Sequence, residues 1–247
     1  MTGDRLGDLV GDITTCRRCP RLVAWRESVA RTKVARHRRS VYWGRPVPGF
    51  GDPQARVLIV GLAPAAHGGN RTGRVFTGDN PGGSGELLFQ ALYETGFTLR
   101  PRSVAAGDGL RLQGAYIAAA VRCAPPANRP SVEERDACLP FLSRELALLT
   151  DVRVIVALGA FAWHVSLRVL ASAGHVSRPR PRFGHGVEAH VGSFELLGCY
   201  HPSQQNTFTG RLDGRMLADV LDRARELSES ALTGKPASAD GDRADDG

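Results

Sequence analysis

The sequence predicts an α/β fold, in which a parallel β-sheet carries helices on both of its faces. Short apolar runs that are typical of buried strands alternate along the chain with stretches of helical periodicity. Three of these runs end in unusual loops, which begin at Gly61, Arg122 and His201. Because the carboxyl ends of parallel strands meet at one edge of a sheet, we expect the three loops to form a single site there.

Four strands are expected in the sheet, with helices between them. The first, residues 57–60, leads through a glycine-rich loop into a helix that reaches Tyr93. The second, residues 115–121, precedes a stiff loop with two adjacent prolines. Ser131 and Glu134 then have the spacing of a capping box, which predicts the start of another helix.

The same alternation continues through the second half of the chain. A third strand is expected at residues 153–158, before a helix at about 161–170, and a fourth at 194–199. Residues 187–191 have the pattern of an edge strand. A final amphipathic helix extends to about residue 227.

Length and composition are those of a soluble globular protein. The chain has 247 residues, which is long enough for one large α/β domain or two small ones, and 42% of them are hydrophobic and 23% charged, as is ordinary for a soluble globular protein. We expect a single domain to span residues 1–228, with helical stretches before residue 31 and an irregular, extended segment at 31–55. Residues 229–247 have the composition of a disordered tail.

Neither a membrane span nor a secretory signal is expected. No apolar segment approaches the ~20 residues that are needed to cross a bilayer. The first residues lack the basic-then-apolar pattern of a secretory signal. We therefore expect a cytoplasmic protein without a membrane partner, whose cysteines are metal ligands or buried residues and not disulfides.

The net charge of +7 is unevenly distributed along the chain. Between Glu27 and Asp52 there is no acidic residue, and the basic residues there are Arg31, Lys33, Arg36, Arg38, Arg39 and Arg45. A second cluster, at residues 178–182, alternates arginine with proline. Such stripes are expected where a protein binds the phosphate backbone of a nucleic acid. A solvated surface in an arginine-rich protein is the alternative explanation.

The loop after the first strand, residues 61–79, has the composition of a nucleotide-binding loop. Its glycines let main-chain N–H groups approach an anion. Arg71 and Arg74 add positive charge, Phe76 offers a ring face and Asp79 a carboxylate. An ordinary surface loop is the alternative, because glycine-rich loops between a strand and a helix are common. The pattern argues against a P-loop NTPase, since Arg74 stands where the lysine is required.

Four cysteines have a spacing that indicates a metal site. Cys16 and Cys19 form a Cys-x2-Cys pair, and Cys123 and Cys138 lie in the proline loop and in the helix after it. Four such thiolates can hold zinc or a 4Fe-4S cluster, and the spacing alone does not decide between them. Four unrelated buried cysteines are the alternative. Cys199, within the fourth expected strand, is interpreted as a core residue.

The loop Gly61-Leu-Ala-Pro-Ala, the motif His201-Pro-Ser and the four cysteines together resemble the uracil-DNA glycosylase superfamily. The branch that they resemble most is family 5, the type B enzymes, over residues 15–227. The resemblance implies a three-layer α/β/α sandwich with a four-stranded parallel sheet and a 4Fe-4S cluster on the four cysteines. It also implies a monomeric, monofunctional DNA glycosylase of base excision repair, which hydrolyses the N-glycosidic bond of uracil in double-stranded DNA and leaves an abasic site.

The same resemblance implies roles for individual residues. His201 would donate a hydrogen bond to an oxygen of the departing base, and Asp79 would stabilise the sugar cation or orient water. A core histidine and a solvent-facing aspartate are the simpler alternatives. Contacts with the base are expected from Ala63, His67, Phe76 and Asn128. Contacts with DNA are expected from Arg71, Arg74, Ser203, Asn206, Phe208 and Arg211, with Phe208 placed to fill the gap that a flipped base leaves.

Two positions depart from the pattern of the related family 4. Leu62 stands where that family has a glutamate, and Ala119 where it has an asparagine that reads the base. Losing a base-reading amide reduces discrimination, so we expect the substrate range to include deaminated purines such as hypoxanthine. A rival hypothesis is a non-catalytic Fe–S protein that binds uracil-containing DNA without releasing the base. An electron carrier is disfavoured, because it has no use for a basic glycine loop.

Overall fold

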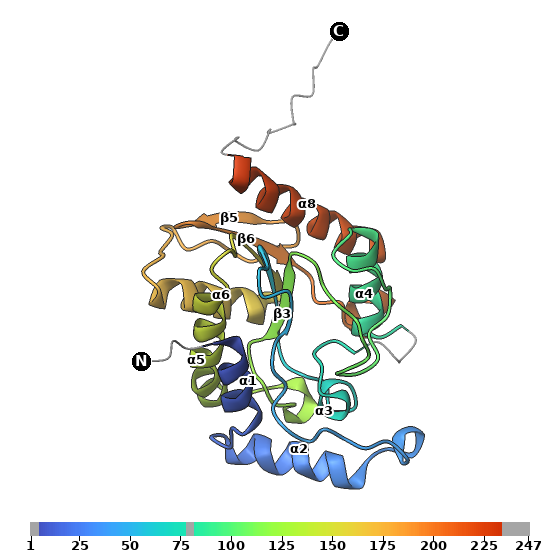
Figure 1. The fold of residues 1–247 in the computed structure, drawn as a ribbon. Coiled ribbons are helices and arrows are strands. Elements are labelled where there is room, and N and C mark those ends of the chain that lie inside the picture. The colour runs from blue at the N-terminus through green and yellow to red at the C-terminus, as the bar shows by residue number, and fades with distance from the viewer. Residues whose placement is uncertain (1–4, 78–81, 234–247) are drawn as a thin grey trace.

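The computed structural model describes residues 5–77 and 82–233. Its centre is a six-stranded sheet with the strand order β1-β3-β2-β4-β6-β5 (Figure 1). The four central strands run parallel, and the two edge strands run antiparallel to their neighbours. The predicted four-stranded parallel sheet is therefore the central part of a mixed sheet, to which the fold adds one short strand at each edge.

The central strands are the apolar runs that the sequence predicts. β2 (Val57–Gly61), β3 (Ala115–Ala119) and β4 (Val154–Leu158) are buried along their whole length, and β6 (Phe194–Cys199) is buried over most of it. A sheet that is covered by helices on both faces selects continuous apolar runs, because both sides of each strand face a core.

The edge strands differ in how well the sequence predicts them. β5 (Glu188–Val191) confirms the expected edge strand. β1 (Phe50–Gly51) lies in the segment that was expected to be irregular. Its position depends on a remote side chain, because the N–H of Gly49 donates to Glu145 Oε1 at 3.2 Å, and Glu145 is itself buried in an ion pair with Arg122. A pairing of this kind cannot be read from local sequence.

Helices cover the two faces of the sheet and complete the predicted three-layer sandwich (Figure 1). α4 (Ser84–Glu94) and α8 (Gly214–Thr233) pack on one face, where their apolar side chains join those of the strands in one core cluster. α5 (Val132–Leu148) and α6 (Ala160–Ser172) pack on the other face in a second cluster.

The start of α5 agrees with the sequence prediction, whereas the end of α8 lies beyond the predicted one. α5 begins with the predicted capping box: the N–H of Glu134 donates to Ser131 Oγ at 3.3 Å, and the N–H of Ser131 donates to Glu134 Oε2 at 2.7 Å. α8 continues to Thr233, past residue 228, after which the tail was expected to begin. Residues 234–247 lie outside the described part of the chain.

The remaining helices lie before the first strand or within the loops. α1 (Leu6–Thr14) packs against α5, and α2 (Pro20–Thr32) runs across the bottom of the molecule in Figure 1. Leu22 of α2 packs against Val121, just beyond the carboxyl end of β3. The short helical turns are η1 (Ala35–His37), α3 (Gly69–Thr72), η2 (Pro126–Asn128) and α7 (Gln204–Phe208).

Within residues 5–77 and 82–233, no helix has both the length and the apolar character that crossing a membrane requires.

Candidate active site

His201 directly follows β6 at the carboxyl edge of the sheet. Its carbonyl oxygen accepts hydrogen bonds from Asn206 Nδ2 at 2.8 Å and from the N–H of Ser203 at 2.7 Å, so its own loop holds its backbone in place. Gly159, at the end of β4, has φ +93°, and a Cβ there would lie 3.3 Å from the Cβ of His201. Burial lowers the pKa of His201 to about 4. The imidazole is therefore neutral at neutral pH and offers one N–H donor.

The ring of Phe76 lies beside His201. The two ring centroids are 5.8 Å apart, and the ring planes are tilted by 34°. Phe76 has φ +53°, a left-handed conformation that is uncommon and strained for a residue with a side chain. A Cβ on Gly61 would lie 2.6 Å from two atoms of the Phe76 ring, so the glycine at the end of β2 makes room for it. A ring face beside a neutral donor suits a planar polar ligand such as a nucleobase.

The neighbouring strand ends contribute apolar side chains to this edge. Gly61 and Ala119 are register partners at the ends of β2 and β3, and Ala119 is buried. Leu62 follows directly, and its carbonyl oxygen accepts a hydrogen bond from the N–H of Val121 at 2.9 Å. The two positions that depart from the family 4 pattern, Leu62 and Ala119, therefore lie at adjacent strand ends, and neither side chain can read a base by a hydrogen bond.

Ala63 and His67, both in the glycine loop, contact different parts of the protein. Ala63 packs against the cluster that contains Cys123. His67 Nδ1 forms a hydrogen bond with the hydroxyl of Tyr42 at 3.0 Å, and the His67 carbonyl oxygen accepts from Arg71 Nε at 2.9 Å. These contacts hold His67 and Arg71 next to the basic segment around Tyr42. Contact of Ala63 or His67 with a base stays a prediction.

Asn128 lies in a strained turn after β3. Both Ala127 and Asn128 have positive φ angles, +51° and +54°, and both are exposed. Two adjacent non-glycine residues in the left-handed region are costly, and such strain is concentrated at functional sites. The turn presents the Asn128 amide to solvent, consistent with the predicted contact to a ligand.

The loop after His201 carries the exposed residues that were expected to meet DNA. Phe208, in α7, is 76% exposed. Arg211 is also exposed, and its guanidinium stacks on the ring of Tyr200 at 4.4 Å. Asn206 and Ser203, by contrast, both donate to the backbone of His201, a positioning role that the sequence did not reveal.

Arg74 corrects one prediction. It was expected to bind DNA, but its side chain is only 4% exposed and forms an ion pair with Asp108 at 2.7 Å. It also donates to Ser103 Oγ at 3.1 Å and lies over the ring of Phe50 at 4.3 Å. Burial alone would raise the pKa of Asp108, but main-chain N–H groups and the guanidinium hold it at about 2. Arg74 therefore stabilises the fold and does not face a ligand.

Asp79, the second predicted catalytic residue, lies outside the described residues, as does Gly78 before it. The described part of the loop ends at Thr77, whose hydroxyl forms a hydrogen bond with that of Thr72 at 2.8 Å. The role of Asp79 stays a prediction.

Four cysteines from separate parts of the chain come close together. Cys123 and Cys138 are buried in one small cluster, against which Cys19 packs, and Cys16 packs against an adjacent cluster. The pKa of Cys19 is raised, first by burial and then by the nearby thiols of Cys138 and Cys16. All four thiols are free, and Cys199 is fully buried in β6, as expected of a core residue.

The arrangement of the thiols bears on which metal group they could bind. Among the described residues, no group of three or more His, Cys, Asp or Glu side chains could hold one ion. A zinc site needs its ligands to converge on one point. In a 4Fe-4S cluster each thiolate binds a different iron, so the sulfurs stand further apart. The packing of the four thiols does not by itself distinguish zinc from a 4Fe-4S cluster.

Arg26 is a residue that the sequence reading missed. It is only 2% exposed; its Nη1 donates to Cys123 Sγ at 2.9 Å and its Nη2 to the carbonyl oxygen of Cys16 at 3.2 Å. In the described chain no carboxylate pairs with it. A signal was present: Leu22, Arg26 and Val29 have helical spacing, and arginine is out of place on such an apolar stripe.

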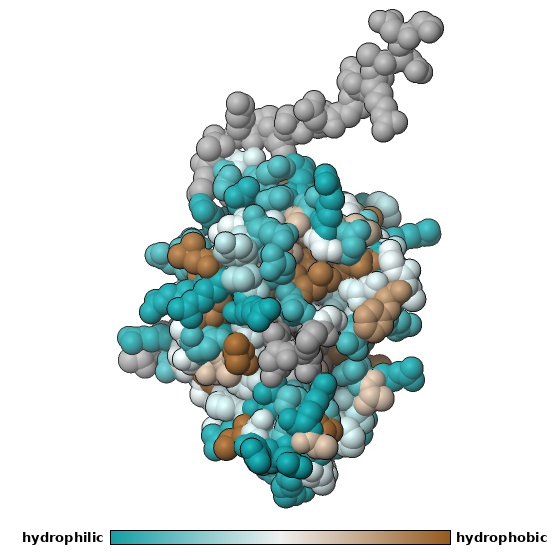
Figure 2. Space-filling view, turned by 90° about the vertical axis from the view of Figure 1, so that its right-hand side faces the viewer, coloured by the Kyte–Doolittle hydropathy of each residue, from teal (hydrophilic) through white to brown (hydrophobic). Residues whose placement is uncertain are grey.

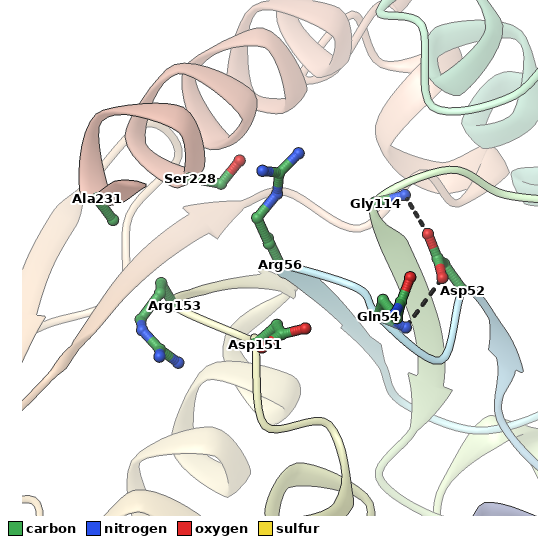
Figure 3. A pocket seen from close by; sticks show the side chains of 8 residues that line it. All are labelled: Asp52, Gln54, Arg56, Gly114, Asp151, Arg153, Ser228 and Ala231. Atoms are coloured by element: carbon green, nitrogen blue, oxygen red, sulfur yellow. Dashed lines mark hydrogen bonds between the residues drawn. The ribbon is translucent and has the colours of Figure 1, made fainter. Parts of the chain in front are cut away.

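A hollow of about 510 Å³ lies at the opposite edge of the sheet, at the amino ends of the strands. Asp52, Arg56, Asp151 and Arg153 line it, so its charges have both signs. Figure 3 shows Arg56 extending toward Ser228 of α8 while Arg153 points away from it. Asp52 is occupied by the N–H groups of Gln54 and Gly114, at 2.9 and 2.8 Å. The polar groups that line the hollow do not converge on one point. The volume of the hollow alone therefore does not identify it as a functional site.

Comparison with known proteins places the chain among DNA repair enzymes. A family model described as "Uracil DNA glycosylase superfamily" matches residues 48–225. The chain is similar to a Type-5 uracil-DNA glycosylase of Mycobacterium bovis, with 54% identity over 87% of this chain and 79% of the relative. It is also similar to Type-5 uracil-DNA glycosylases of Mycobacterium leprae, with 52% identity over 90% and 95%, and of Thermus thermophilus, with 51% identity over 89% and 96%.

Proposed function

The chain belongs to the uracil-DNA glycosylase superfamily, and from this premise we propose that His201 and Phe76 form the centre of its active site. The protein is a DNA glycosylase, a hydrolase that removes uracil from DNA by breaking the N-glycosidic bond. The observation that carries the site assignment is a neutral imidazole beside an aromatic ring face at the carboxyl edge of the sheet.

His201 stabilises the negative charge that develops on the leaving base. When the glycosidic bond breaks, its electron pair stays with the base, whose carbonyl oxygen becomes more negative. A neutral imidazole N–H can donate to that oxygen without the desolvation cost of a buried cation. Because the Asn206 amide and Gly159 constrain the His201 backbone, the donor is held in place before the substrate binds.

Phe76 binds the face of the flipped base. The sugar carbon at the other end of the broken bond is stabilised by the glycine loop. The sugar carbon becomes cationic, and water adds to it to give the abasic site. Leu62 cannot polarise that water, so Asp79 is the carboxylate that we assign to stabilising the cation or orienting the water. No lysine lies in the motif loops to form a Schiff base, and the enzyme is accordingly monofunctional.

The loop 203–211 and Arg71 hold the DNA around the flipped nucleotide. Phe208 is exposed enough to enter the stack that the base vacates. Arg211 is pre-oriented by stacking on Tyr200, which reduces the entropy lost when it pairs with a phosphate. Asn128, exposed in its strained turn, is placed to contact the base or the water.

The range of substrates extends beyond uracil to hypoxanthine. Ala119 and Leu62 leave the strand ends without a side-chain group that reads a base edge. A site that relies on stacking and on one donor to a carbonyl oxygen accepts several bases, because no buried polar group is left unpaired by the wrong one. Hypoxanthine, like uracil, has a carbonyl oxygen that can accept a hydrogen bond from the His201 N–H.

Cys16, Cys19, Cys123 and Cys138 hold a 4Fe-4S cluster, which when bound cross-links the N-terminal helices to the proline loop. Support comes from Arg26. A buried guanidinium with no carboxylate partner is unfavourable, whereas an anionic cluster on these thiolates would supply the missing charge. No step of hydrolysis is assigned to the cluster.

The cluster proposal is tested by iron analysis and visible absorption of the purified protein. Cys138→Ser should lose the iron and the visible band, and Arg26→Met should weaken both while Arg26→Lys retains more. Stoichiometric zinc, or a full iron content in the Cys138→Ser protein, would overturn the assignment.

The catalytic proposal is tested by base release from duplexes that carry one uracil or one hypoxanthine. Wild type should release both bases, and His201→Ala should release neither at a comparable rate. Release that persists in Asp79→Asn would remove Asp79 from the mechanism. Uracil release without any hypoxanthine release would show that the argument from Ala119 is wrong.

A further inference from the structure

A basic surface next to the glycine loop is not used by the active site described above. We call residues 31–45 the basic arm. Its exposed arginines are Arg31, Arg36, Arg38, Arg39 and Arg45. No ion pair with an acidic residue is recorded for any of them in the described part of the chain. Glu27 lies near enough to Arg31 for that arginine to lower its pKa, and the other four arginines present positive charge to solvent without an ion-pair partner among the described residues.

Three of these arginines surround one hollow. The η1 turn bends the chain so that Arg36, Arg38 and Arg39, with Ala35 and Ser40, line a space of about 420 Å³. Like charges brought together on one side of a turn repel each other. The arrangement is unfavourable for the protein alone and becomes favourable when an anion occupies the surface.

The arm is fastened to the loop that carries Phe76. The N–H of Trp43 donates to the carbonyl oxygen of Arg71 at 2.9 Å, and the N–H of Gly44 to that of Asn70 at 3.0 Å. The Tyr42 hydroxyl adds its hydrogen bond to His67. These contacts fix the end of the arm against α3, only a few residues before Phe76, and so place its charges beside the catalytic edge.

The figures show the same relation. In Figure 1 the segment after α2 projects at the lower right, below α3. In Figure 2, which faces that side, the bottom of the molecule is mainly hydrophilic, and hydrophobic side chains lie higher up toward α4 and α8. The arm thus belongs to a mainly hydrophilic surface that lies below α3.

We propose that the basic arm binds the phosphodiester backbone of DNA flanking the flipped nucleotide, as a second grip in addition to the loop 203–211. Charge complementarity selects this occupant: DNA carries one negative charge per about 1.7 Å of its axis, and the arm offers several cations and no acid. The inference rests on the proposed function, which makes damaged DNA the substrate.

The test compares two double variants that remove the same charge. Arg38→Gln/Arg39→Gln changes the arm, and Arg56→Gln/Arg153→Gln changes the hollow at the opposite edge of the sheet. Binding to an undamaged duplex is measured by fluorescence anisotropy between 50 and 200 mM salt. Each lost phosphate contact reduces the magnitude of the negative slope of log K, the logarithm of the association constant, against log salt by about 0.9.

In the arm variant, the magnitude of that slope should fall by about two. Its loss of DNA affinity relative to wild type should therefore be about tenfold larger at 50 mM than at 200 mM salt. The opposite-edge variant should match wild type. Equal losses in both variants, or no loss in either, would overturn the proposal. At saturating DNA the arm variant should release uracil at the wild-type rate.

The two proposals fail separately. A wild-type protein that binds DNA through the arm but releases no base would contradict the catalytic assignment alone. Normal base release with unchanged DNA affinity in the arm variant would contradict the arm alone.

Discussion

The two edges of the sheet differ in a way that identifies the active site. The amino edge has a hollow of about 510 Å³, but its charged groups have both signs, and Asp52 already accepts two main-chain N–H groups. The carboxyl edge holds a desolvated histidine and a strained Phe76. The comparison teaches that unfavourable local energetics mark this site better than empty volume does.

The cause of the difference is the direction of the strands. The loops after β2, β3 and β6 leave the sheet at the carboxyl edge, and their backbones are free to adopt unusual conformations there. Phe76, Ala127 and Asn128 have positive φ angles on that side. The rest of the fold must stabilise this strain. Four predictions test the roles assigned to residues at the two edges and in the fold around them.

The largest effect is expected from His201→Ala. Removing the donor should lower kcat for uracil release by about 10² to 10⁴-fold, because the charge on the leaving base is no longer stabilised. Asp151→Asn at the amino edge should leave kcat unchanged. Single-turnover kinetics checks both, with circular dichroism as the folding control. A similar loss in both variants would mean that the two edges are not functionally distinct.

Arg74→Met should affect stability and not DNA binding. Its ion pair with Asp108 is partly open to solvent, so we expect a loss of about 2–3 kcal/mol in the free energy of unfolding, below the value for fully buried pairs. Urea denaturation measures it. The salt dependence of DNA binding should match wild type, and a reduced slope would restore Arg74 to the DNA-binding surface.

Phe76→Ala should remove a stacking contact worth about 1–3 kcal/mol, which corresponds to about 5- to 150-fold in kcat/KM. Gly61→Ala should produce a comparable loss, because its Cβ would displace the ring. In a protein that already carries Phe76→Ala, the Gly61→Ala change should cost little more. Additive losses would show that Gly61 acts through another group.

The last prediction concerns the change in stability per unit of pH. The pKa of His201 is lowered to about 4 in the fold, against an ordinary value near 6.5. As the pH falls from 6.5 to 4, the unfolded chain takes up a proton that the folded protein does not, so the free energy of unfolding decreases. The contribution is at most about 1.4 kcal/mol per pH unit. His201→Asn should lose this part of the slope in urea titrations; identical slopes would show that burial does not keep His201 neutral.

The sequence predicted the secondary structure well where the signal was local. Continuous apolar runs identified the four central strands, and the spacing of Ser131 and Glu134 identified the start of α5. The position of His201 and Phe76 at one edge followed from the rule for parallel strands, and the structure confirms it. The short strand β1 was missed, because its pairing depends on the buried Glu145.

The sequence by itself determined the alternation of strands and helices, the gathering of three loops at one edge and the identity of the chemical groups in them. Only the tertiary structure decided which charges face solvent. Arg74 finds Asp108 thirty-four positions away, and Arg26 finds Cys123 ninety-seven positions away. Hydrophobic periodicity reports the face on which a residue lies, but burial of an arginine depends on a partner that only folding brings near.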